Sequence, residues 1–106
     1  MHKLTKIAKK MRYSVCKMSH YAKAAHLGSS LSCIDILTAV FFGNIFKFKK
    51  NELNSDKFIL SKGHAAAALY SILAEKKYFN KSNLKKYGKN NSYFEEHPNA
   101  KINGVV

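Results

Sequence analysis

The sequence is short of several residue types, and each scarcity narrows what the protein can be. Its 106 residues include one proline, two cysteines, six acidic residues and no tryptophan. Cys16 and Cys33 are isolated and lack the spacing of metal ligands, so no cysteine-based metal site is expected. No secretory signal precedes them, and we expect two buried thiols in a reducing, cytoplasmic environment.

Arginine is nearly absent, although the chain is strongly basic. A formal charge of +13 arises from 19 basic and six acidic residues, and Arg12 is the one arginine. Proteins that read nucleic-acid sequence rely on arginine forks for bidentate contacts, and the lysines here are spread through several segments. Nucleic-acid binding is therefore the less favoured interpretation, whereas an anionic substrate or cofactor suits this charge.

Long hydrophobic runs are missing as well. The longest, residues 34–46, contains Asp35 and Asn44 and is too short to span a bilayer, which argues against a membrane protein. With 46% hydrophobic and 24% charged residues, the composition is that of a globular chain. The length allows one small domain, which we take as residues 1–106.

The first half of the chain carries two helix patterns. Apolar residues recur at steps of three and four up to Ala22, with lysines on the opposite face, and predict an amphipathic helix. The small residues of 24–31 favour a tight loop. Ser32, three residues before Asp35, resembles a capping box, and the run 34–42 that follows is apolar on nearly every side, which predicts a buried helix.

The most informative segment is residues 58–79, which read FILSKGHAAAALYSILAEKKYF. Phe58–Leu60 has the pattern of a short buried parallel strand, and a Ser-Lys-Gly-His turn leads from it into a helix over residues 65–77. A turn glycine such as Gly63 lets the backbone approach a ligand, and a helix start presents unpaired N–H groups to anions. These features predict an anion pocket at His64.

One strand cannot form a sheet, because parallel strands need neighbours at their edges and helices over both faces. The sequence therefore predicts an incomplete α/β fold, mostly helical with one or two parallel strands. Either another polypeptide supplies the missing strands, or the chain is the leading part of a longer one.

After the helix at residues 65–77, Ser82 is a candidate cap for a short helix closed by Gly88, and the tail from residue 89 should be irregular.

Three patches of the sequence carry more information together than each does alone. They read AHLGSSLSCIDILTAVFFGNIF at 25–46, DKFILSKGHAAAALYSILAEKKYF at 56–79 and HPNAKINGV at 97–105. In this order and spacing they resemble the N-terminal, thiamine-diphosphate-binding region of transketolases, in particular the split form whose first subunit carries this domain. The resemblance covers nearly the whole chain and corresponds to the leading portion of such a subunit.

The resemblance implies roles for three of the five histidines. His26 is similar to the family's first active-site histidine, which faces the substrate and assists proton transfer. His97 is similar to the histidine that hydrogen-bonds the donor ketose. His64, with Gly63 beside it, resembles the histidine that contacts the cofactor near its diphosphate. Imidazoles suit proton transfer because they titrate near neutral pH; the other two histidines are expected to be ordinary surface residues.

The implied activity is the thiamine-diphosphate-dependent transfer of a two-carbon ketol unit between sugar phosphates. Magnesium is implied too, yet the Gly-Asp-Gly and asparagine motif that holds it in the family does not occur in these residues, so no metal ligand is assigned. We therefore expect a truncated diphosphate-binding domain, inactive alone. It would depend on a C-terminal transketolase subunit or on the remainder of the chain, in an oligomer.

The sequence also departs from the family pattern. Ala25 and Leu27 replace the Gly and Pro that commonly flank the first histidine, and Glu96 stands where a glycine usually precedes the third. An alternative from another class is a non-catalytic scaffold that docks a partner through the helix at residues 34–42. A small basic nucleic-acid-binding protein is the less favoured third possibility.

Overall fold

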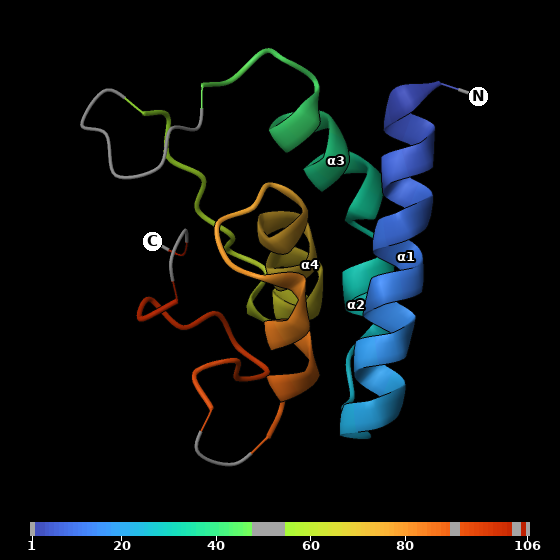
Figure 1. Ribbon diagram of the computed structural model, residues 1–106, viewed down its shortest axis with the longest axis vertical. Helices are drawn as coiled ribbons and strands as arrows, with labels where there is room; N and C mark the ends of the chain where they lie inside the picture. The colour runs from blue at the N-terminus through green and yellow to red at the C-terminus, as the bar shows by residue number, and fades with distance from the viewer. Residues whose placement is uncertain (1, 48–54, 90–91, 103–104, 106) are drawn as a thin grey trace.

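The structure is a computed structural model that describes residues 2–47, 55–89, 92–102 and 105. Its elements are α1 (Lys3–Ala22), α2 (Leu27–Leu31), α3 (Ile34–Phe42), the 3₁₀ turn η1 (Gly63–Ala65), α4 (Ala66–Glu75) and the 3₁₀ turn η2 (Lys81–Lys86). In Figure 1, α1 stands along one side of the molecule, and it contacts α2, α3 and α4. No helix in these described ranges is both long and apolar enough to cross a membrane.

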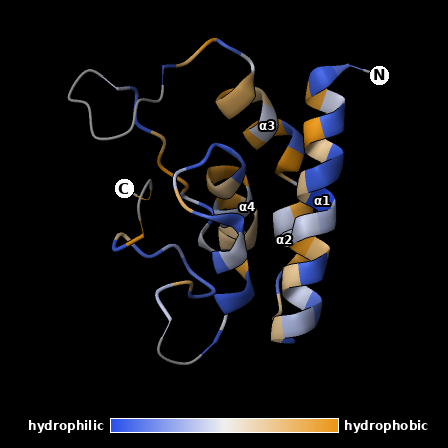
Figure 2. Ribbon diagram, viewed as in Figure 1, coloured by the Kyte–Doolittle hydropathy of each residue, from blue (hydrophilic) through white to orange (hydrophobic). Residues whose placement is uncertain are grey.

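Helix α1 forms as its apolar spacing predicts. One stripe of side chains is buried against the core, while the lysines on the other side are exposed, so hydrophobic and hydrophilic colours alternate along α1 in Figure 2. The stripe consists of Ile7, Ala8, Met11, Val15 and Met18. Cys16 is exposed, so the prediction of a buried thiol there is wrong, because Cys16 lies about 100° around the helix from Val15. Cys33 is half-buried.

Helix α4 forms the centre of the core. Each of its residues from Ala66 to Ala74 is buried, as expected of a helix that is apolar all round. The small alanines on its first turn let neighbouring segments approach closely, and Leu69, Ile72 and Leu73 fill the space further along. The helix is shorter than the predicted range 65–77, because a 3₁₀ turn replaces its start and a left-handed Lys77 ends it.

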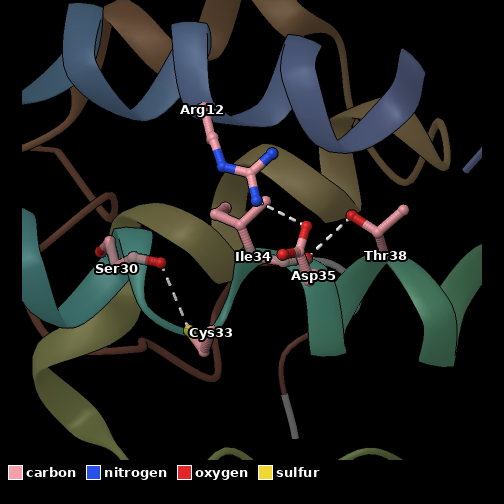
Figure 3. A network of polar contacts seen from close by, with 6 residues as sticks. All are labelled: Arg12, Ser30, Cys33, Ile34, Asp35 and Thr38. Carbon is pink, nitrogen blue, oxygen red and sulfur yellow. Dashed lines mark hydrogen bonds and ion pairs between the residues drawn. The ribbon is translucent and has the colours of Figure 1, made fainter. Parts of the chain in front are cut away.

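Helix α3 has the predicted bounds, but it is not buried on every side. Ile34, Leu37, Thr38 and Phe41 face the core, whereas Ile36 is 66% exposed. Figure 3 shows how α3 is fixed at its start: Arg12 reaches from α1 to Asp35 at 2.6 Å between Nη2 and Oδ1, and Thr38 Oγ1 donates to the Ile34 carbonyl.

The expected capping box at Ser32 does not form. The residue preceding α3 is Cys33, whose thiol makes no cap hydrogen bond to the helix and instead contacts the Ser30 carbonyl (Figure 3). Ser32 closes α2, a short helix in the segment 24–31 that was expected to be a loop. Similarly, η2 is capped by Asn80, whose side chain accepts from the Ser82 amide, and not by Ser82 itself.

The predicted strand at Phe58–Leu60 is wrong for the residues that the structure describes, which form helices and turns but no strand. Phe58 and Leu60 pack against the core while Ile59 is exposed, the alternation of an extended backbone. A strand also requires ladder hydrogen bonds to a neighbour, and the described part of the chain provides none here. The α/β prediction is therefore corrected to an all-helical arrangement over these ranges.

Candidate functional site

Three histidines from three distant segments meet on the surface of the molecule. The ring centroids of His26 and His64 lie 4.2 Å apart, and those of His64 and His97 lie 4.9 Å apart. His64 Nδ1 is 3.3 Å from His26 Nε2, a hydrogen-bond distance whose donor depends on the tautomers. All three side chains are exposed. We call this group the histidine cluster.

The backbone at His26 helps to place its ring in the cluster. His26 precedes α2 with φ of 70°, in the left-handed region that residues other than glycine seldom adopt. Its carbonyl accepts the Ser30 amide at 3.2 Å, which starts α2 directly after the turn from α1. The sequence pattern around 24–31 did not reveal this conformation, because no glycine marks it.

Two residues help to position His97: Gly63 lies against its ring, and Tyr70 forms a hydrogen bond to its backbone. A side chain at Gly63 would place its Cβ 3.0 Å from His97 Nδ1, so a glycine is needed for the ring to come this close. The hydroxyl of Tyr70, from the buried side of α4, donates to the His97 carbonyl at 2.9 Å. Burial raises the pKa of Tyr70, so its hydroxyl stays protonated and able to donate at neutral pH.

Lys62 is a charged neighbour of the cluster that the sequence reasoning missed. It directly precedes Gly63, is exposed, and its ammonium donates to Ser32 Oγ at 2.5 Å. Ser32 Oγ in turn donates to the Ser29 carbonyl at 3.0 Å. A basic residue beside a predicted anion-binding turn was the available signal, because such a residue adds charge to the backbone N–H groups.

Cys33 lies in the same neighbourhood, but its chemistry does not favour a nucleophile. Burial raises the pKa of its thiol, and the positive charge of Lys62 opposes this rise without reversing it. The thiol therefore stays protonated at neutral pH. It is better described as a structural contact between α2 and α3 than as a reactive group.

The arrangement is suited to an anion and to proton transfer. It presents three imidazoles and one ammonium to solvent at a glycine turn, so it combines positive charge, close backbone approach and side chains of the type used for proton transfer. Across the ranges that the structure describes, no group of three or more histidine, cysteine or acidic side chains has a geometry that could hold a metal ion.

Comparison with protein-family models shows which proteins share this sequence pattern. Residues 4–106 match the family described as transketolase, thiamine diphosphate binding domain. The chain belongs to this transketolase family. The match spans nearly every residue and includes all three segments that contribute to the histidine cluster.

Individual transketolase relatives agree with the family match. An apulose-4-phosphate transketolase subunit from Phocaeicola vulgatus is 32% identical over 100 residues, which cover 92% of this chain and 36% of the relative. The corresponding subunit from Actinobacillus succinogenes is 33% identical over 98 residues, 90% of this chain and 36% of the relative. Human transketolase is 31% identical over 94 residues, which cover 86% of this chain and 15% of its own length. The chain thus spans about a third of the two bacterial relatives.

The comparisons establish the transketolase family and leave the roles of individual residues as predictions. His26 and His97 as catalytic residues, and His64 and Gly63 as cofactor contacts, are inferred from the resemblance. The structure adds that these four residues lie together and that Lys62 and Tyr70 adjoin them. Of the tail patch that carried part of the resemblance, residues 103–104 lie outside the described ranges.

Proposed function

We propose that this chain supplies one wall of a transketolase-type active site, at which a two-carbon ketol unit passes between sugar phosphates with thiamine diphosphate as cofactor. The observation that carries the proposal is the convergence of His26, His64 and His97 within one cluster, although the chain between the first and last spans most of the sequence. A family domain that binds thiamine diphosphate supplies the context.

The residues of the cluster fit the diphosphate end of the cofactor. Gly63 offers a backbone without a side chain, and His64 lies between the other two histidines. Lys62 offers a positive charge whose partner, in the part of the chain that the structure describes, is the Ser32 hydroxyl. Exposed, positively charged groups at a glycine turn bind phosphate oxygens well. When bound, thiamine diphosphate supplies the carbon–carbon chemistry.

The chain's own histidines would hold and move protons around the sugar. In this proposal His26 accepts or donates a proton at the substrate, and its contact with His64 couples the tautomers of the two rings. His97, held through its carbonyl by Tyr70, orients the donor ketose by hydrogen bonding to its hydroxyl and carbonyl groups. Glu96 directly precedes His97 in the sequence, which makes it a candidate determinant of sugar preference.

Magnesium does not fit the described residues, since no cluster of carboxylate or histidine ligands is present among them. We infer that the ligands of a cofactor-bound magnesium lie outside this set, and no step is assigned to the metal here. The isolated chain is accordingly expected to be inactive. A partner polypeptide, as the word subunit implies in the names of the bacterial relatives, or further residues would complete the site. A cytoplasmic location remains a prediction.

A chimera tests this proposal directly. The matched segment of the Phocaeicola vulgatus relative would be replaced by residues 4–106 of this chain, and the product assayed with its partner polypeptide on apulose-4-phosphate. We expect measurable ketol transfer. Substituting His26→Ala, His64→Ala or His97→Ala should each lower kcat/KM at least about tenfold, because each variant loses a contact to substrate or cofactor that is worth about 1.4 kcal/mol or more.

The matched control is His20→Ala, since this histidine is exposed and lies outside the cluster. It should leave kcat/KM within about twofold, well under the change that 1 kcal/mol of lost stabilisation would produce. An active chimera in which the cluster variants behave like this control would refute the assigned roles.

A second candidate function is docking to a partner without catalysis, and a specific observation favours it. Ile36 on α3, Ile45 and Ile59 are 66%, 76% and 70% exposed, so these large aliphatic side chains are accessible to a partner. Sedimentation analysis of the purified chain separates the two possibilities. Self-association that Ile36→Ser abolishes would support docking, whereas a monomer at all concentrations would count against it.

A further inference from the structure

A groove between α1 and η2 shares no residue with the histidine cluster. Its volume is about 630 Å³, within the range of small-molecule sites in proteins. Six residues give it its chemical character: Tyr13, Lys17, Tyr21, Lys81, Lys85 and Tyr87. We call it the tyrosine–lysine groove, and neither the sequence patterns nor the transketolase resemblance assigns it a role.

One wall of the groove is a stripe of α1 on which aromatic rings and a cation alternate. Tyr13, Lys17 and Tyr21 are four residues apart and therefore lie on the same side of the helix. Tyr13 is 69% exposed and Tyr21 is 64% exposed, so both side chains are accessible to a ligand. Lys17 Nζ lies 5.8 Å from the centre of the Tyr13 ring, which places its charge beside this tyrosine.

The opposite wall adds positive charge, and apolar side chains contribute to both walls. Lys81 and Lys85 come from η2, while Met18 of α1 and Leu84 of η2 also line the groove. Lys81 is partly neutralised, because its ammonium is 2.5 Å from Glu75 Oε1. Within the residues that the structure describes, Lys17 and Lys85 have no carboxylate partner.

These features define the ligand by its chemistry. Exposed tyrosine side chains and apolar neighbours favour a ligand with a planar ring. Stacking on the tyrosines and removal of apolar surface from water both stabilise the binding of such a ring. Two lysines without carboxylate partners favour an anion, and compact ammonium groups bind phosphate as point charges. We propose that the tyrosine–lysine groove binds an organic phosphate that carries a planar ring, with the ring against Tyr13 and Tyr21 and the phosphate between Lys17 and Lys85.

The test is a titration of the complete ¹⁵N-labelled chain with 1-naphthyl phosphate, followed by NMR. The largest amide shifts are expected at Tyr13, Lys17, Tyr21 and Leu84. Inorganic phosphate, which lacks the ring, and 1-naphthol, which lacks the charge, should each bind at least about tenfold more weakly, because each loses one of the two contacts. Shifts centred on the histidine cluster, with none in the groove, would overturn the proposal.

Substitutions on exposed positions of α1 complete the test without threatening the fold. Lys17→Glu and Tyr21→Ala should each weaken binding of 1-naphthyl phosphate at least about fivefold. The matched control is Lys3→Glu, the same charge change on an exposed position of the same helix that does not line the groove. Equal weakening by Lys3→Glu and Lys17→Glu would show a response to net charge alone and would contradict a defined site.

Discussion

At the scale of single residues, the candidate site depends on contacts that bring side chains of ordinary surface type into unusual proximity. The histidine cluster is exposed, so its members are held by their backbones more than by burial. His26 is placed by a left-handed turn, His64 by η1, and His97 by the glycine beside it and by Tyr70. Small changes at these supports should therefore move the rings without unfolding the chain.

Gly63→Ala tests the closest of these supports. The added Cβ would meet His97 Nδ1 at 3.0 Å, so the exposed His97 ring must shift by a few tenths of an ångström away from residue 63. Because the ring is free to move, the free energy of unfolding should change by no more than about 0.5 kcal/mol. Carbon-13 spectra of the histidine rings should show altered His97 and His64 signals.

The matched control is Gly28→Ala, where a Cβ would meet nothing within 4 Å. It lies inside α2, so alanine should leave the histidine signals unchanged and be neutral or slightly stabilising. Unaltered His97 signals in Gly63→Ala would contradict the close approach that the structure shows.

Tyr70→Phe removes the hydroxyl that donates to the His97 carbonyl. The variant should lose about 1 kcal/mol of stability at neutral pH, the usual net worth of one hydrogen bond, and the tail around His97 should loosen. Urea denaturation monitored by circular dichroism measures the first effect, and amide exchange of the tail measures the second.

The same tyrosine predicts an alkaline dependence of stability. Burial raises the pKa of Tyr70, and also those of Tyr78 and Tyr87, above the value in the unfolded chain. The unfolded state then loses its tyrosine protons first, so the stabilisation is complete below about pH 10 and falls as the pH rises beyond it. Tyr70→Phe should flatten this fall. A stability that is constant from about pH 8 to about pH 11 would be inconsistent with buried, protonated tyrosines.

At the scale of elements, local sequence patterns predicted the long helices well but could not predict whether a strand pairs with a neighbour. The apolar stripe of α1 and the bounds of α3 follow from spacing that each helix carries in its own residues. The strand at Phe58–Leu60 could not be settled in this way, because strand formation depends on a neighbour that residues 58–60 do not encode. The short helix α2 was missed because its glycine and serines are also typical of loops.

The candidate site was likewise predictable only where the information lies in local sequence. His26, His64, His97 and Gly63 could be selected through the family resemblance of three sequence patches, and the residues around Gly63 themselves predicted an anion-binding turn, which stays a prediction. The contribution of Lys62 depends on its contact with Ser32, which lies 30 positions away in the sequence. That contact is a product of the packing of α2 against η1, so no local pattern could reveal it.

Leu73→Ala tests the central place of α4. The side chain is fully buried, so its truncation should cost about 2–5 kcal/mol through lost burial and a residual cavity. Ile36→Ala on α3 is the control, since an exposed aliphatic side chain should cost less than about 0.5 kcal/mol. Chemical denaturation of both variants gives the comparison. Equal losses would mean that α4 does not form the core.

At the scale of the whole molecule, the chain presents a helical core with candidate binding features at its surface. The histidine cluster is one such feature, the tyrosine–lysine groove is another, and the exposed isoleucines are a third. The chain spans about a third of its bacterial relatives, and the described residues include no metal-ligand cluster. Productive catalysis is therefore proposed for an assembly, while the isolated chain should retain a weak affinity for the cofactor.

The most direct test is a titration of the isolated chain with thiamine diphosphate and magnesium, followed through the ring signals of its five histidines. We predict shifts of His26, His64 and His97 with a Kd above about 1 mM, worth less than about 4 kcal/mol, and unshifted His2 and His20. Submillimolar binding would contradict the dependence on further ligands. Saturation without any response from the three clustered rings would contradict the site itself.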